Sequence, residues 1–154
     1  MSVTATLYYG FELGSPGEDT WKVREVDEYG SLKTEGLPWA QAAKEDDDYP
    51  EHLRAALLSE AGVEAAEMSS SEMEKAVAQH WGVVFVEHGY VPGGLTHLGI
   101  ALKGAVYESD DWTAKSIAPS THGQSHMLLL NALLALGLTP VQANPSWLLA
   151  PGER

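Results

Sequence analysis

The sequence contains no cysteine among its 154 residues. This absence excludes disulfide bonds, thiol catalysis, iron–sulfur clusters and zinc sites built on cysteine. It also fits the reducing conditions of the cytoplasm, which is the location that we expect. Residues 1–13 support that expectation, because they lack the basic start and the continuous apolar stretch of a signal peptide.

Long hydrophobic runs are also missing. The longest apolar stretch extends from Met127 to Leu138 and is interrupted by Asn131 and Gly137. A helix that spans a membrane needs about 20 apolar residues. We therefore expect no membrane span and no membrane partner.

Basic residues are few. Lys and Arg number 9 against 22 Asp and Glu, which gives a formal net charge of −13. Proteins bind nucleic-acid phosphates by neutralising them with cations, so generic DNA or RNA binding is not expected. The acidic surface has two interpretations. It serves solubility and self-repulsion, or it docks a basic partner, for example by imitating nucleic acid.

Several catalytic and cofactor motifs do not occur in the chain. It contains no G-x-G-x-x-G, no G-x-x-x-x-G-K-[ST], no G-x-S-x-G and no H-E-x-x-H. These absences remove the common dinucleotide, phosphate, serine-hydrolase and zinc-protease signatures. We expect no cofactor.

The hydrophobic and charged fractions of 44% and 20% are those of a globular protein, and we expect one domain over residues 1–154. Apolar residues alternate with polar ones over residues 3–13, which predicts a half-buried strand. A helix is predicted from Pro50 to Ala61, with Leu53, Leu57, Leu58 and Ala61 inward. A second helix begins within Ser69-Ser70-Ser71 and ends at Gly82. Both Ser69 with Glu72 and Ser71 with Glu74 have the spacing of a capping box.

Residues 83–91 and 96–107 form the clearest hairpin pattern, joined by residues 92–95. If Gly93-Gly94 is the turn, Phe85 faces Leu102 and Glu87 faces Ile100. We expect one buried face and an opposite, wetter face. The buried face has Phe85, Leu98, Ile100 and Leu102, and the wetter face has His88 and His97.

A helix is predicted over residues 121–137, opened by Thr121 with Gln124 at capping-box spacing. Residues 141–149 form a last strand, and Pro145 indicates a sheet edge. The resulting order predicts an α+β fold, an antiparallel sheet with helices on one face. It is compatible with the ferredoxin-like β-α-β-β-α-β pattern.

His88, His97 and Tyr90 are predicted on one face of the hairpin. A histidine pair there can act as acid and base near neutral pH, or bind a small ligand. The simpler interpretation is a polar outer sheet face that needs no function.

Two groups of residues have the chemistry of metal ligands. His122 and His126 are four apart at a helix start, but no Glu follows His122 as in the zinc-protease motif. Glu108, Asp110 and Asp111 have the oxygen ligands that magnesium or calcium prefers, but their spacing is not that of an EF-hand loop. We therefore expect no structural metal ion.

Three stretches, 86–90, 98–102 and 106–112, resemble part of a group of small uncharacterised proteins from phages, prophages and their bacterial hosts. The resemblance covers Val86-Glu87-His88-Gly89-Tyr90, Leu98-Gly99-Ile100-Ala101-Leu102 and Val106-Tyr107-Glu108-Ser109-Asp110-Asp111-Trp112. It implies an accessory role, such as modulation of a host protein. It carries over no site residue.

These observations favour a non-catalytic protein–protein interaction domain that acts as a homo-oligomer or on a host partner. Residues 127–136 are apolar except for Asn131, so this helix must be covered on more than one side. The two earlier helices can cover it within the single domain, or a homodimer through residues 121–136 can cover the side that they leave exposed. The alternative is a small metal-dependent or acid–base enzyme, or a small-ligand binder, that uses the histidine and tyrosine face of the hairpin.

The charge balance gives a first testable prediction. At a net charge of −13 we expect no gel shift of generic duplex DNA by micromolar protein at physiological salt. A shift that weakens as salt is raised would contradict this prediction and would locate a basic patch near Lys103 and Lys115.

Overall fold

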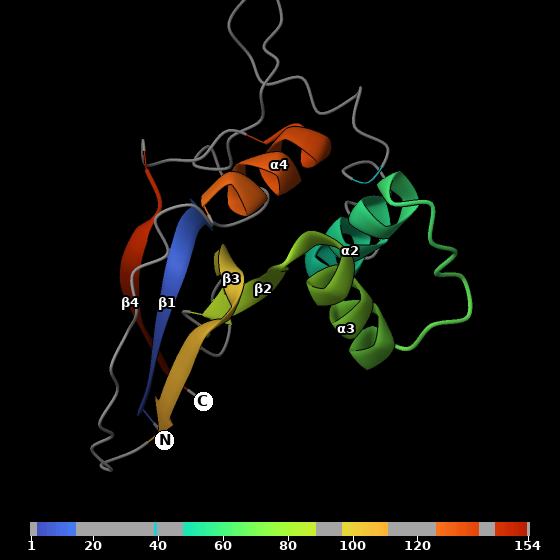
Figure 1. The fold of residues 1–154 in the computed structure, drawn as a ribbon. Coiled ribbons are helices and arrows are strands. Elements are labelled where there is room, and N and C mark those ends of the chain that lie inside the picture. Colours follow the sequence, from blue (N-terminus) through green and yellow to red (C-terminus); the bar gives the residue numbers. More distant parts are fainter. Residues whose placement is uncertain are drawn as a thin grey trace, which may run out of the picture.

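The computed structural model describes residues 3–14, 39, 48–88, 97–110, 126–138 and 144–153. Within these ranges the chain forms an antiparallel sheet and three long helices (Figure 1). In chain order the elements are β1 (Val3–Gly14), α2 (Tyr49–Glu60), α3 (Ser70–Trp81), β2 (Val83–His88), β3 (His97–Asp110), α4 (His126–Leu136) and β4 (Ser146–Glu153). The predicted α+β class is confirmed.

The sheet has the strand order β2-β3-β1-β4, and every neighbouring pair is antiparallel. Because β1 and β2 both run against β3, they are parallel to each other with β3 between them. In the same way β3 and β4 are parallel with β1 between them. Two split β-α-β units have this arrangement of strands. The ferredoxin-like assignment itself stays a prediction, since it also concerns connections that lie partly outside the described residues.

Local hydrogen bonds begin the first two predicted helices. The Asp48 side chain accepts a hydrogen bond from the backbone N–H of Glu51, at 3.4 Å, before α2. Of the two capping-box pairs that the sequence offered, Ser69 and Glu72 form the box of α3, with bonds of 3.2 and 3.3 Å. The expectation that Ala61 faces inward is wrong. Ala61 is exposed because α2 ends at Glu60 and Ala61 takes the C-cap position.

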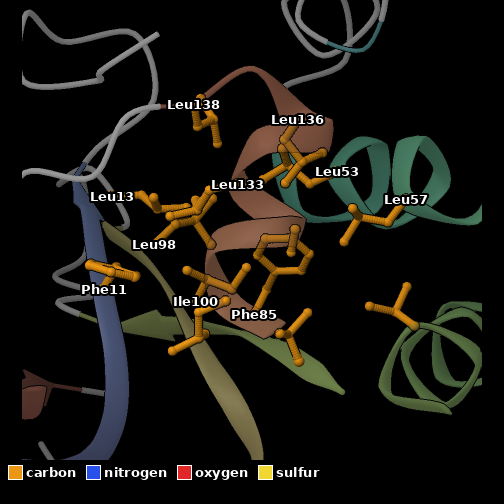
Figure 2. Packing of buried hydrophobic residues seen from close by; sticks show 14 of the residues in the cluster. Phe11, Leu13, Leu53, Leu57, Phe85, Leu98, Ile100, Leu133, Leu136 and Leu138 are labelled. Carbon is orange, nitrogen blue, oxygen red and sulfur yellow. The ribbon is translucent and has the colours of Figure 1, made fainter. Parts of the chain in front are cut away.

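The described helices lie on one side of the sheet, as predicted. α4 packs against β1, β2 and β3, α3 packs against β2, and α2 packs against α3 and α4. Figure 2 shows Leu133 and Leu136 of α4 gathered with Phe85, Leu98 and Ile100 of the β2–β3 hairpin, and Leu53 and Leu57 of α2 beside them. Two indole groups connect the helices. The Trp81 Nε1–H donates to the carbonyl of Leu57 at 2.8 Å, and the buried Trp39 Nε1–H donates to that of Leu136 at 3.0 Å. No helix of the described part is long and apolar enough to cross a membrane.

β1 and β3 approach unusually closely at Gly10. A Cβ atom at this position would collide with the carbonyl oxygen of Ile100, so no other residue fits without a backbone shift. Beside it the ladder is irregular, since Tyr8 pairs with Val106 whereas Gly10 pairs with Ala101. The extra residues of β3 form a bulge, and β1 and β3 are paired on either side of it.

The hairpin register differs from the predicted one. Phe85 lies opposite Ile100, not Leu102, and Glu87 lies opposite Leu98, not Ile100. The error is a shift of two residues, and side chains alternate with a period of two, so the assignment of faces is unaffected. Phe85, Leu98, Ile100 and Leu102 are buried, as predicted. The proposed turn at Gly93-Gly94 lies outside the described residues.

The last two elements also correct the predicted bounds. α4 is described from His126, and the proposed cap at Thr121 and Gln124 lies outside the described residues. β4 continues past Leu149 to Glu153, because the long β1 strand offers a partner as far as Val3. The edge position of this strand is confirmed by the strand order.

The core makes a direct prediction about stability. Leu133 is fully buried, so Leu133→Ala should lower the free energy of unfolding by about 2–5 kcal/mol. Leu149 is 71% exposed, so Leu149→Ala should change it by less than about 0.5 kcal/mol. Urea unfolding of both variants measures the difference. Equal losses would contradict the packing of α4.

Candidate functional site

A polar cluster occupies the sheet face opposite the helices. Tyr8 and Glu12 come from β1, His88 comes from the end of β2, and His97 comes from the start of β3. The alternation of β1 places Tyr8 and Glu12 opposite to the buried Phe11. His88 and His97 are direct partners in the β2–β3 ladder. Three strands therefore contribute side chains to one place.

Gly99 of β3 allows side chains of β1 and β2 to meet across the strand between them. It pairs with Glu12 on one side and with Val86 on the other. A Cβ atom at Gly99 would lie 2.7 Å from the Cζ atom of Tyr8. The tyrosine ring therefore occupies the space above Gly99, and the Glu12 carboxylate can reach His88 on the far strand.

One oxygen of Glu12 joins the cluster. Its Oε2 atom accepts a hydrogen bond from the Tyr8 hydroxyl at 2.8 Å and lies 2.6 Å from His88 Nε2. A carboxylate only accepts, so His88 Nε2 carries the hydrogen. The His88 and His97 rings lie 5.7 Å apart between centroids, with 21° between their planes. The Tyr8 ring is 6.1 Å from that of His88.

The cluster is drier than the sequence predicts. The Tyr8 side chain is fully buried and packs with Val86, Ala101 and Ala150. The side chains of His88 and Glu12 are 13% and 29% exposed. Burial, and then the charge and the hydrogen bond of Glu12, raise the pKa of Tyr8. Tyr8 therefore stays a neutral donor near neutral pH.

The geometry sets the chemistry that His88 can perform. Glu12 fixes the ring with the proton on Nε2, so a neutral His88 has its lone pair on Nδ1. A histidine oriented by a carboxylate can accept a proton, as a general base does, or bind a cation. Among the described residues there is no group of three or more His, Asp or Glu placed to hold a metal ion.

The other predicted site residues do not join this cluster within the described part of the chain. Glu108 is exposed on β3 and pairs with Thr6, on the other side of the bulge from His97. His126 is the first residue of α4 and is half-buried. Tyr90, Asp111 and His122 lie outside the described residues, as does the side chain of Asp110. Of the predicted group of His88, His97 and Tyr90, the structure therefore tests only the two histidines, and these lie side by side.

Sequence reasoning missed Tyr8 and Glu12 as members of the site. The alternation of the first strand had placed both on its polar face, which was a usable signal. What the pattern lacked was the identity of the neighbouring strand. Only the pairing of β1 with β3 brings Glu12 within reach of His88.

Comparison with known proteins does not extend this description. No protein-family model matches the chain, and no curated protein or solved structure is significantly similar to it. The resemblance to small phage and prophage proteins therefore stays a prediction.

The buried tyrosine predicts how stability depends on pH. An unfolded tyrosine ionises near pH 10, whereas Tyr8 has a raised pKa in the folded protein. The contribution of Tyr8 to the free energy of unfolding is therefore fully present below pH 10 and is lost above it. The loss between pH 10 and 11 is about 1 kcal/mol.

Tyr8→Phe should remove that part of the alkaline loss, which urea unfolding at pH 9, 10 and 11 measures. Tyr9→Phe is the matched control on the same strand, and it should keep the wild-type dependence because Tyr8 remains. An identical fall in all three proteins would show that Tyr8 is not the group responsible.

Proposed function

We propose that the protein is a non-catalytic protein–protein interaction domain, and that its contact surface is an apolar stripe on α4. The stripe consists of Met127, Leu128 and Leu134, whose exposed fractions are 52%, 42% and 58%. Leu149 of β4 is the other large hydrophobic residue that is strongly exposed in the described part of the chain. A concentration of such side chains on one short helix is typical of a contact surface.

The stripe follows from a helix that is apolar all round. Leu129, Ala132, Leu133 and Leu136 point into the core. Met127, Asn131 and Leu134 are spaced i, i+4 and i+7, so they share the outward face. On an ordinary surface helix this face would carry charged residues. Here Asn131 is its polar member, and α4 contains no Asp, Glu, Lys or Arg.

A second copy of the chain is the occupant that fits this stripe. Each copy has a net charge of −13, so two copies repel each other through most of their surface. Contact through α4 avoids the burial of like charges, because the helix carries none. Asn131 also suits a two-fold contact, since its amide offers both a donor and an acceptor to the same amide of the partner.

The small size of the stripe indicates a weak dimer. Stable interfaces bury about 800 Å² on each partner, more than three part-exposed side chains provide. We therefore infer an association that depends on concentration in the micromolar range. The proposal includes a cytoplasmic location and, from the resemblance to phage-type proteins, an accessory role on a host protein, whose basic surface the net negative charge would attract.

A charge on the stripe tests the proposal. Leu134→Glu should shift the wild-type mass, measured by light scattering at tens of micromolar, from that of a dimer to that of a monomer. A carboxylate cannot be buried at such a contact without a large cost, whereas it is solvated in the monomer. The fold should remain, because Leu134 is already 58% exposed.

Leu149→Glu is the matched control, since it places the same charge at a leucine that is 71% exposed but lies on β4. It should leave the dimer intact. A wild-type protein that stays monomeric at these concentrations would contradict the homodimer, and a dimer that survives Leu134→Glu would place the interface elsewhere.

The contact of 2.6 Å between Glu12 and His88 favours a second candidate function. A histidine held by a carboxylate beside a second histidine is an arrangement for proton transfer or for ligand binding. This function would use the face opposite the helices, and the α4 stripe would play no part in it.

A further inference from the structure

We propose that His88 and His97 together bind one divalent transition-metal ion, such as Zn²⁺, Ni²⁺ or Cu²⁺, on the sheet face opposite the helices. The proposal rests on the second candidate function and does not depend on dimerisation through α4. The sequence predicted the absence of a structural ion held by several ligands that are close together in the sequence. The site proposed here has two protein ligands that are brought together only by the pairing of β2 with β3.

The separation of the two rings is close to that of a chelating pair. Zinc bonds an imidazole nitrogen at about 2.0–2.1 Å, which places it about 3.2 Å from the ring centre. Two imidazoles in a tetrahedral zinc site then have their centres about 5 Å apart. The centroids of His88 and His97 are 5.7 Å apart. The rings are stacked, with 21° between their planes, so both side chains must rotate to direct one nitrogen of each ring at a common ion. The two residues are direct partners in the ladder, which places their Cβ atoms about 4.5–5.5 Å apart and lets both side chains reach one ion.

Glu12 supplies the support that metal-binding histidines commonly have. Such a histidine donates its other ring N–H to a carboxylate, which fixes the ring and makes the ligating nitrogen more basic. His88 Nε2 lies 2.6 Å from Glu12 Oε2, so Nδ1 is the nitrogen left to bind an ion. The buried Tyr8 hydroxyl donates to the same oxygen at 2.8 Å and holds the carboxylate in place. The chain Tyr8–Glu12–His88 is thus already assembled.

The chemistry of the ligands selects the class of ion. Neutral imidazoles suit zinc, nickel and copper, whereas magnesium and calcium require oxygen ligands. A net charge of −13 also raises the local concentration of cations and disfavours anionic ligands. With two protein ligands, water would complete the coordination sphere. The ion would therefore exchange readily with ions in solution.

Calorimetric titration of the full chain with ZnCl₂ or NiCl₂, in chelator-free buffer at pH 7.5, tests the site. The wild type should bind one ion with saturation. His97→Ala should weaken binding at least tenfold, because one of two ligands is lost. Glu12→Gln should weaken it about 10- to 100-fold, which is the usual effect of removing a supporting carboxylate. His97 is chosen because it is half-buried near the sheet end, so the variant should fold.

His80→Ala is the matched control. His80 is exposed on α3, so this variant removes a surface imidazole and should bind as the wild type does. Leu134→Glu should also bind normally, which separates this site from the α4 contact. The proposal would be overturned if the wild type showed no saturable binding, or if His97→Ala bound as tightly as His80→Ala.

Discussion

The close pairing of β1 with β3 connects the parts of this molecule. β1 is the partner of both β3 and β4, and β3 also pairs with β2, so the two strands form the centre of the sheet. Gly10 makes this approach possible, because any side chain there would meet the backbone of Ile100. The same pairing gives the helices their apolar floor, through Phe11 and Ile100, and gives the opposite face its polar cluster.

The two faces of the sheet follow different physical rules. The face covered by the helices is closely packed and leaves no room for water, because leucines of α2 and α4 pack together with Phe85, Leu98 and Ile100. On the other face a smaller apolar cluster of Tyr8, Val86, Ala101 and Ala150 adjoins the hydrogen bonds between Tyr8, Glu12 and His88. Gly99 leaves room for the Tyr8 ring, and the buried hydroxyl then requires an acceptor, which Glu12 provides. A polar network in such a place orders the side chains that form it, and His88, whose side chain is 13% exposed, is held in place by the Glu12 carboxylate.

α4 and the acidic remainder of the chain impose opposite demands. The excess of acidic residues makes two copies of the chain repel each other electrostatically. By contrast, α4 has no Asp, Glu, Lys or Arg and exposes Met127, Leu128 and Leu134 to water. These demands are compatible if contact is confined to α4, which is also the helix whose opposite side closes the core. Because the same eleven residues of α4 serve core and surface, Leu133 and Leu134 are neighbours with unlike roles.

The sequence by itself determined the features that depend on a few consecutive residues. The cap at the start of α3, the end of α3 at Gly82, the alternation of β1 and the two faces of the hairpin all follow from local hydrogen bonding and from side-chain period. Tertiary structure alone decided the hairpin register, the end of β4 at Glu153 and the meeting of Glu12 with His88. These features depend on which strands become neighbours, and residues as far apart as Glu12 and His88 leave no local pattern that encodes it. Strand pairing is fixed only when the whole sheet closes over one core. The fold class and the meeting of His88 with His97 were therefore readable from the chain, whereas the contribution of Tyr8 and Glu12 to the site was not.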